Sequence, residues 1–155
     1  MKERDKMAEK KDEKFELLKH INQDAGMASY TIENLLNELK EKDNKIKEIA
    51  EDILKEYQHF FKETKEILNK NKISIDEKSF IDKMGAKMGI KMDVTNDNSD
   101  SSIADMLIKG ISMGSIDMEK KIADYKKCVD EKSLSLAKDF LKFQNDSIDK
   151  LKTYL

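Results

Sequence analysis

The stretch FELLKHINQDAGMASYTIENLLNEL, residues 15–39, decides the fold of this chain. Its apolar and small residues recur at alternating intervals of three and four, which is the spacing of one face of an α-helix. We therefore predict a helix over about 13–41 that packs this face against partner helices. The face consists of Phe15, Leu18, Asn22, Ala25, Ser29, Ile32, Leu36 and Leu39.

The same spacing occurs in three further stretches and predicts helices over about 45–70, 101–129 and 132–154. The breaks near 41–45 and near Asp130 are short. Short connections make consecutive helices antiparallel neighbours, so we expect two antiparallel hairpins. A capping-box pattern at Ser102 and Asp105 predicts that the third helix begins near 101 or 102.

The composition favours one helical domain over 13–155. The chain has 155 residues, no Pro and only 5 Gly, and 40% of its residues are charged with both signs mixed. Long helices with solvated outer faces have this composition, and the length suits one domain. Residues 1–12 are almost all charged, and we expect them to form a flexible N-terminal segment.

Residues 71–100 are too many for a simple turn between the two hairpins. Their pattern predicts a partly helical crossover, with a helix over about 79–92. A crossover of this length lets the second hairpin begin at the end of the bundle where the first began. We therefore expect an all-α four-helix bundle with ferritin-like connectivity, and an up-down-up-down bundle is the alternative.

Three segments carry a resemblance to a known family: Met84-Gly-Ala-Lys-Met-Gly-Ile-Lys-Met92, Ile103-Ala-Asp-Met-Leu-Ile-Lys-Gly110 and Leu151-Lys-Thr-Tyr-Leu155. Over about 12–155 the chain resembles the ferritin-like superfamily, and in particular small clostridial bundles of unknown function. The resemblance implies the bundle fold and a bacterial source, and it implies no activity.

Di-iron proteins of that architecture bind metal through inward glutamates and Glu-x-x-His pairs. Here Glu56 and His59 form such a pair, and Glu33 lies at about the same height on the first helix. Gln144 is an inward polar residue on the last helix and the fourth candidate ligand. These four residues define the metal site of the alternative function, for which iron is the expected cofactor.

Helical phase argues against this site. At about 100° per residue, Glu33 and Glu56 fall on the flanks of their helices, and His59 falls on the outer face. The same reasoning places His20 away from its helix's seam. We therefore expect no catalytic residue and no resident cofactor, and we interpret the inward polar residues as groups that fix helix register.

Several other functions are disfavoured by composition. The net charge of −2 gives no electrostatic footprint for nucleic acid, and no segment resembles a membrane span or a signal peptide. A single cysteine, Cys128, favours a reducing cytoplasm. Phosphate-binding glycine loops and nucleophile elbows do not occur in the sequence.

Two features of the third helix point to contacts. Met106 and Met113 lie away from its main apolar stripe, so another surface is expected to cover them. Gly110 and Gly114 lie one turn apart and predict close packing against the crossover helix. We therefore expect a non-enzymatic bundle that acts by self-association or by binding a protein partner through the Met106/Met113 face. The alternative is a diverged ferritin-like metal-binding protein that stores or oxidises iron or handles oxygen species.

Overall fold

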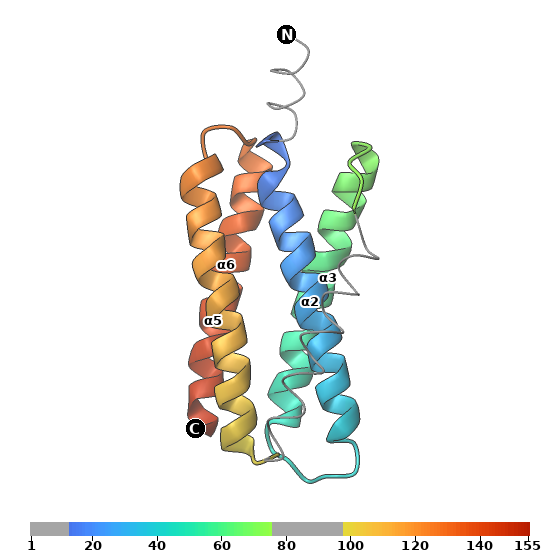
Figure 1. The fold of residues 1–155 in the computed structure, drawn as a ribbon, viewed down its shortest axis with the longest axis vertical. Helices are drawn as coiled ribbons and strands as arrows, with labels where there is room; N and C mark the ends of the chain where they lie inside the picture. Colours follow the sequence, from blue (N-terminus) through green and yellow to red (C-terminus); the bar gives the residue numbers. More distant parts are fainter. Residues whose placement is uncertain (1–12, 76–97) are drawn as a thin grey trace, which may run out of the picture.

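The computed structural model describes residues 13–75 and 98–155. Within these residues the chain is all-helical and contains no strand, as expected for a four-helix bundle (Figure 1). The elements are α2 (Glu16–Glu38), α3 (Lys47–Lys70), α5 (Asp100–Tyr125), α6 (Glu131–Leu151) and a final 3-10 turn, η1 (Lys152–Tyr154). The predicted N-terminal segment and the predicted helix over 79–92 lie outside the described residues.

The helix ends differ from the predicted bounds by four residues or fewer. The prediction of Ser102 as the cap of the third helix is wrong. The N-cap is Ser99, whose hydroxyl accepts a hydrogen bond from the Ser102 backbone N–H, and α5 begins at Asp100. Asp130 caps α6 in the same way by accepting from the Ser133 backbone N–H at 2.7 Å.

Residues far apart in sequence meet at the two ends of the bundle. The α2–α3 turn lies beside the start of α5, where Asn44 Nδ2 donates to Asp100 Oδ1 at 2.9 Å (Figure 1). At the other end, the α5–α6 turn lies near the start of α2. There, Lys121 Nζ on α5 lies 3.9 Å from Glu16 Oε2 on α2.

Asp100 caps a helix other than its own. The N-cap residue of α3 is Ile46, whose apolar side chain cannot accept a hydrogen bond. The Asp100 carboxylate instead accepts from the backbone N–H groups of Lys45 at 3.2 Å and Ile46 at 3.4 Å. Desolvation raises the pKa of Asp100, but the hydrogen bonds from Asn44 and from these two N–H groups outweigh it, so the pKa lies below its usual value.

The core is centred on α2, which packs against each of the other three helices. A helix with three neighbours buries a wider arc than the single predicted seam. Leu17, Ile21 and Leu35 lie outside that seam and are buried together with its members Leu18 and Ile32. This wider arc also brings polar residues of α2 into the interior, as described below.

Aromatic side chains join α3 to α6. The ring of Tyr57 meets the rings of Phe140 and Phe143 edge to face, with centroids 5.9 and 4.8 Å away. Phe60 packs edge to face on Phe140 at 5.0 Å and stacks on Phe143 at 5.6 Å. Such pairs contribute about 0.5–1.5 kcal/mol each beyond the area that they bury.

One buried polar pair connects α2 to α3. The amide Nδ2 of Asn22 donates to Thr64 Oγ1 at 3.2 Å and to the Phe61 carbonyl at 3.3 Å. Asn22 and Thr64 are both buried, as the seam positions predicted. Because a shift of either helix would leave these groups unpaired inside the bundle, the pair fixes the register of α2 against α3.

Candidate functional site

The structure does not bring the four predicted metal ligands together. Glu33, Glu56 and His59 are exposed, whereas Gln144 is fully buried. Glu33 accepts a hydrogen bond from Gln58 Nε2 at 2.8 Å. His59 Nε2 lies 3.6 Å from the Glu63 carboxylate on the same helix. The exposure of the first three residues agrees with the helical-phase argument made from the sequence.

The two described ranges contain no group of three or more His, Cys, Asp or Glu side chains that could hold a metal ion. Cys128 is exposed. The polar chemistry of the interior comes instead from a set of residues that we name the Asp24 cluster. Its members are His20 and Asp24 on α2, Tyr57 on α3, Gly114 on α5 and Gln144 on α6.

Gln144 is the central hydrogen-bond donor of the Asp24 cluster. Its Nε2 donates to Asp24 Oδ2 at 2.8 Å and, more weakly, to the Tyr57 hydroxyl oxygen at 3.4 Å. This one amide thereby connects α6 to α2 and to α3. Gln144 Oε1 is buried and has no hydrogen-bond partner among the described residues. Because this oxygen lacks a partner, part of the free-energy cost of removing the amide from water is not offset.

The Asp24 carboxyl group lies inside the bundle, and burial raises its pKa from 3.8 to about 6. The hydrogen bond from Gln144 lowers the pKa and the negative charge of Asp117 raises it, but desolvation dominates. The same physics acts on Tyr57, whose pKa is raised by burial and then by the neighbouring charge of Asp24. The pKa of Asp24 therefore lies well above that of an exposed aspartate.

His20 lies outside the main seam of α2, and its imidazole is partly buried against α5. Its Nε2 is buried and has no hydrogen-bond partner among the described residues. Desolvation lowers the pKa of His20, and the positive charge of Lys121 lowers it further. Asp117 and the backbone of Gly114 offset part of this effect. His20 faces α5 because α2 is covered on three sides.

Gly114 leaves space for the buried carboxyl group. A Cβ atom at this position would overlap Asp24 Oδ2 and lie 2.8 Å from Gln144 Nε2. At Gly110 no described atom lies within 4 Å of a Cβ. Gly114 therefore lies close to side chains of α2 and α6, whereas the described residues show no such approach at Gly110. The predicted packing against the crossover helix lies outside the described residues.

The sequence contains a signal for Asp24 that the single-seam interpretation missed. Leu17, Ile21, Ala28 and Leu35 form a second row on α2, spaced by four or seven residues, and Asp24 lies in the same row between Ile21 and Ala28. A charged residue within an apolar row marks a buried polar site when that row faces a partner. Only the tertiary structure, in which α5 and α6 pack against α2, shows that this row faces a partner.

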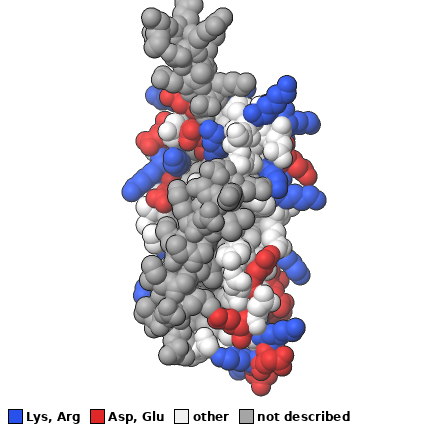
Figure 2. Space-filling view, turned by 45° about the vertical axis from the view of Figure 1, so that its right-hand side comes forward, with Lys and Arg blue, Asp and Glu red and all other residues white. Residues whose placement is uncertain are grey.

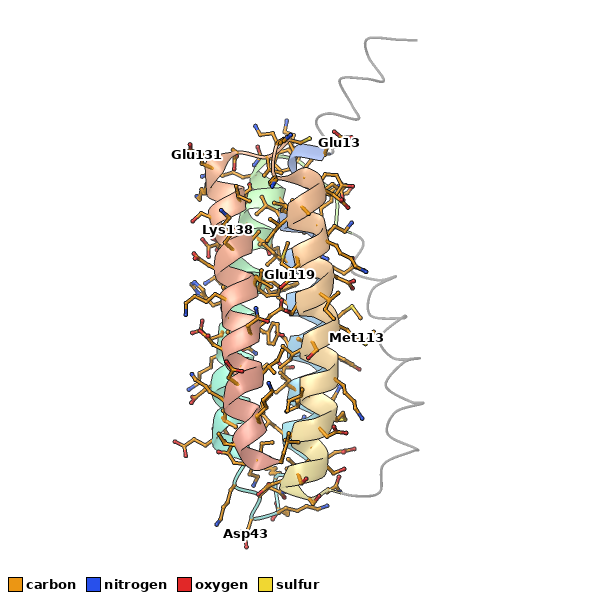
Figure 3. All side chains as sticks on the ribbon, turned by 90° about the vertical axis from the view of Figure 1, so that its left-hand side faces the viewer. Glu13, Asp43, Met113, Glu119, Glu131 and Lys138 are labelled. Carbon is orange, nitrogen blue, oxygen red and sulfur yellow. The ribbon has the colours of Figure 1, made fainter. Side chains whose placement is uncertain are left out.

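The outer face of α5 carries exposed apolar side chains. Met113 is 65% exposed and Ile116, three residues further along the same helix, is 52% exposed. Figure 3 shows Met113 on the outer side of α5, away from α6. Met106 is partly buried against the core. The face predicted from Met106 and Met113 is therefore centred closer to Met113 and Ile116.

A groove of about 720 Å³ runs between α3 and α6. Apolar side chains line it together with charged residues of both signs, and it extends to Tyr154 in η1. On the face displayed in Figure 2, acidic and basic residues are likewise interspersed. The Asp24 cluster lies in the interior and the groove opens to solvent, so they are separate features.

Comparisons with protein-family models, with curated proteins and with solved structures found no match. In the described ranges, every helix is too short or too polar to cross a lipid bilayer.

We expect Asp24→Asn to increase stability at pH 7.5. The pKa of Asp24 is about 6 in the folded protein and 3.8 in the unfolded chain. The contribution of Asp24 to the free energy of unfolding is therefore fully present below pH 3.8 and is lost as the pH rises through 6. The full effect corresponds to about 3 kcal/mol. Urea unfolding from pH 4 to 7.5 should show the wild-type protein approaching the variant at low pH. His20 is present in both proteins, so its opposite pH dependence cancels, and parallel curves would contradict the prediction.

Gly114→Ala should destabilise the bundle by about 1–3 kcal/mol, because its Cβ overlaps a buried, hydrogen-bonded pair of side chains. Gly110→Ala is the matched control on the same helix. It introduces no contact in the described structure and should stabilise α5 by up to about 1 kcal/mol. Thermal unfolding followed by circular dichroism measures both, and equal effects of the two substitutions would contradict the packing at Gly114.

Proposed function

We propose that this chain is a non-enzymatic helical bundle that acts by binding, and that its first partner is a second copy of itself. The contact would be the outer face of α5, which we define by Met106, Met113 and Ile116. The observation that carries the proposal is the exposure of Met113 and Ile116 on one side of a helix whose other side is buried. Adjacent exposed apolar side chains favour association because contact removes them from water.

The Asp24 cluster supports a structural role over a catalytic one. Its carboxyl group is buried and accepts a hydrogen bond from Gln144, which is itself fully buried. A general acid or base must come within hydrogen-bond distance of its substrate. The cluster is therefore proposed to connect the helices, with the outer surface available for binding.

The proposal includes a ferritin-like connectivity of two antiparallel hairpins joined by a long crossover. Two contacts support it. Asn44 in the α2–α3 turn bonds to Asp100 at the start of α5, and Glu16 at the start of α2 pairs with Lys121 near the end of α5. A second hairpin that begins where the first one turns requires a connection along the length of the bundle. The bacterial and cytoplasmic setting remains part of the proposal.

Replacing Met113 and Ile116 together by lysine should abolish self-association. The substitutions place two like charges in the apolar centre of the proposed contact, where burying a charge is strongly unfavourable. Sedimentation equilibrium over a hundredfold concentration range should show an oligomer for the wild-type chain and a monomer for the double variant.

Leu155→Lys is the control for this experiment. Leu155 is 63% exposed, similar to Met113, but lies at the end of the chain beyond η1. It should leave the association unchanged. A wild-type chain that stays monomeric at the highest concentration, or a control that dissociates as readily as the double variant, would refute this function.

The alternative is a ferritin-like metal-binding protein that uses Glu33, Glu56, His59 and Gln144. It predicts that the protein binds about two Fe(II) per chain, the number held by a di-iron centre, and that Glu56→Ala reduces this number. Anaerobic titration followed by exposure to oxygen tests it directly. We expect no binding above that of the Glu56→Ala variant, because three of these side chains are exposed and Gln144 donates to Asp24.

A further inference from the structure

The groove between α3 and α6 has an apolar floor. The aromatic rings of Phe60 and Phe143 stack there with centroids 5.6 Å apart, and both belong to the cluster that joins the two helices. Ile49 and Ile53 continue this floor along α3 towards the end near the α2–α3 turn. Floors of aromatic and aliphatic side chains are typical of surfaces that bind an apolar ligand face.

The walls of the groove differ in charge. Glu48, Asp52 and Glu56 recur every four residues of α3, so they form one acidic row. On α6 the wall alternates in sign, with Asp139, Lys142, Asp146 and Lys150.

On the α6 wall, one lysine and one aspartate neutralise each other. On the α3 wall, Lys55 is the one lysine beside three carboxylates. Lys142 Nζ binds the Asp146 carboxylate at 2.7 Å. Without this pair, the groove lining retains four carboxylates against the two lysines Lys55 and Lys150. The groove therefore carries excess negative charge concentrated along α3.

The groove is elongated along the two helices. From Glu48 to Phe60 on α3, and from Asp139 to Lys150 on α6, it follows each helix for about 17–18 Å at 1.5 Å per residue. A helix of about 12 residues covers the same length. Small ligands are shorter than this, whereas helix-in-groove recognition uses apolar residues spaced over several turns.

We propose that the α3–α6 groove binds an amphipathic helix of another protein, one whose apolar stripe is bordered by lysine or arginine. The stripe would lie over Phe143 and Ile49, the partly exposed apolar residues of the floor, and its cations would lie along the acidic row of α3. This function is separate from self-association through α5, because the residues of the two surfaces do not overlap.

The test uses three fluorescein-labelled synthetic peptides of Leu with Lys or Glu, each long enough to form about three helical turns. The first is amphipathic and basic, the second carries Glu in place of every Lys, and the third is a basic scramble without an apolar stripe. Fluorescence anisotropy with the full chain should show binding of the first peptide only. Backbone amide shifts should move on α3 and α6.

The variant pair isolates the acidic row. Asp52→Lys with Glu56→Lys reverses two charges that line the groove, and it should weaken binding about tenfold. Glu51→Lys with Glu66→Lys makes the same charge change at exposed positions of α3 outside the groove lining, and it should weaken binding less than about twofold. Circular dichroism confirms that both variants remain folded.

Three results would overturn the proposal. Equal loss in the two variants would mean that only overall charge matters. Equal binding of the scrambled or the acidic peptide would exclude recognition of a basic apolar stripe. Self-association that the Asp52/Glu56 variant alone removes would assign the groove to a second copy of the chain. Met113 and Ile116 are unchanged in these variants. A negative result for the groove therefore does not affect the proposal of self-association through α5, which the lysine double variant tests separately.

Discussion

The hydrogen bond from Gln144 to Asp24 is the interaction around which the interior is arranged. It spans 120 positions of sequence and closes α6 onto α2. A buried carboxylate is stable only with a partner, so α6 must present Gln144 at this height and α5 must present a residue without a side chain. Gly114 meets the second requirement, and Tyr57 lies on the other side of the same amide. This polar contact therefore connects α6 to α2 and α3 and requires a glycine on α5.

Polar interactions of this kind set the specificity of the bundle, whereas apolar burial supplies most of its stability. Leucine and isoleucine rows can pack in several registers with similar energy, but a buried hydrogen bond is satisfied in only one. Asn22 with Thr64 fixes α2 against α3, and Asp100 fixes the start of α3 against the start of α5. The outer surfaces are then available for binding, because the groove between α3 and α6 and the outer face of α5 carry none of these contacts.

The location of the polar interior also explains why the metal site of the alternative function differs from the observed cluster. Glu56 and His59 match a ligand motif in spacing, but they lie on the solvated side of α3. His20 and Asp24 match no motif at all, yet they are drawn inside because α2 has a neighbour on three sides. Motif spacing reports which residues share a helix face, and it contains no information on which face is covered.

From its sequence alone, this protein specifies the four helices of the described ranges, the short α2–α3 and α5–α6 turns and the main seam of each helix, because helical periodicity and breaks in apolar pattern are local properties. Asn22, Thr64 and Gln144 could be placed inside by the same rule. The second buried row of α2, the pairing of Asp24 with Gln144 and the groove along α3 were decided only by the tertiary structure. Each depends on how closely and at what height distant helices approach one another, and a one-dimensional pattern does not encode these distances.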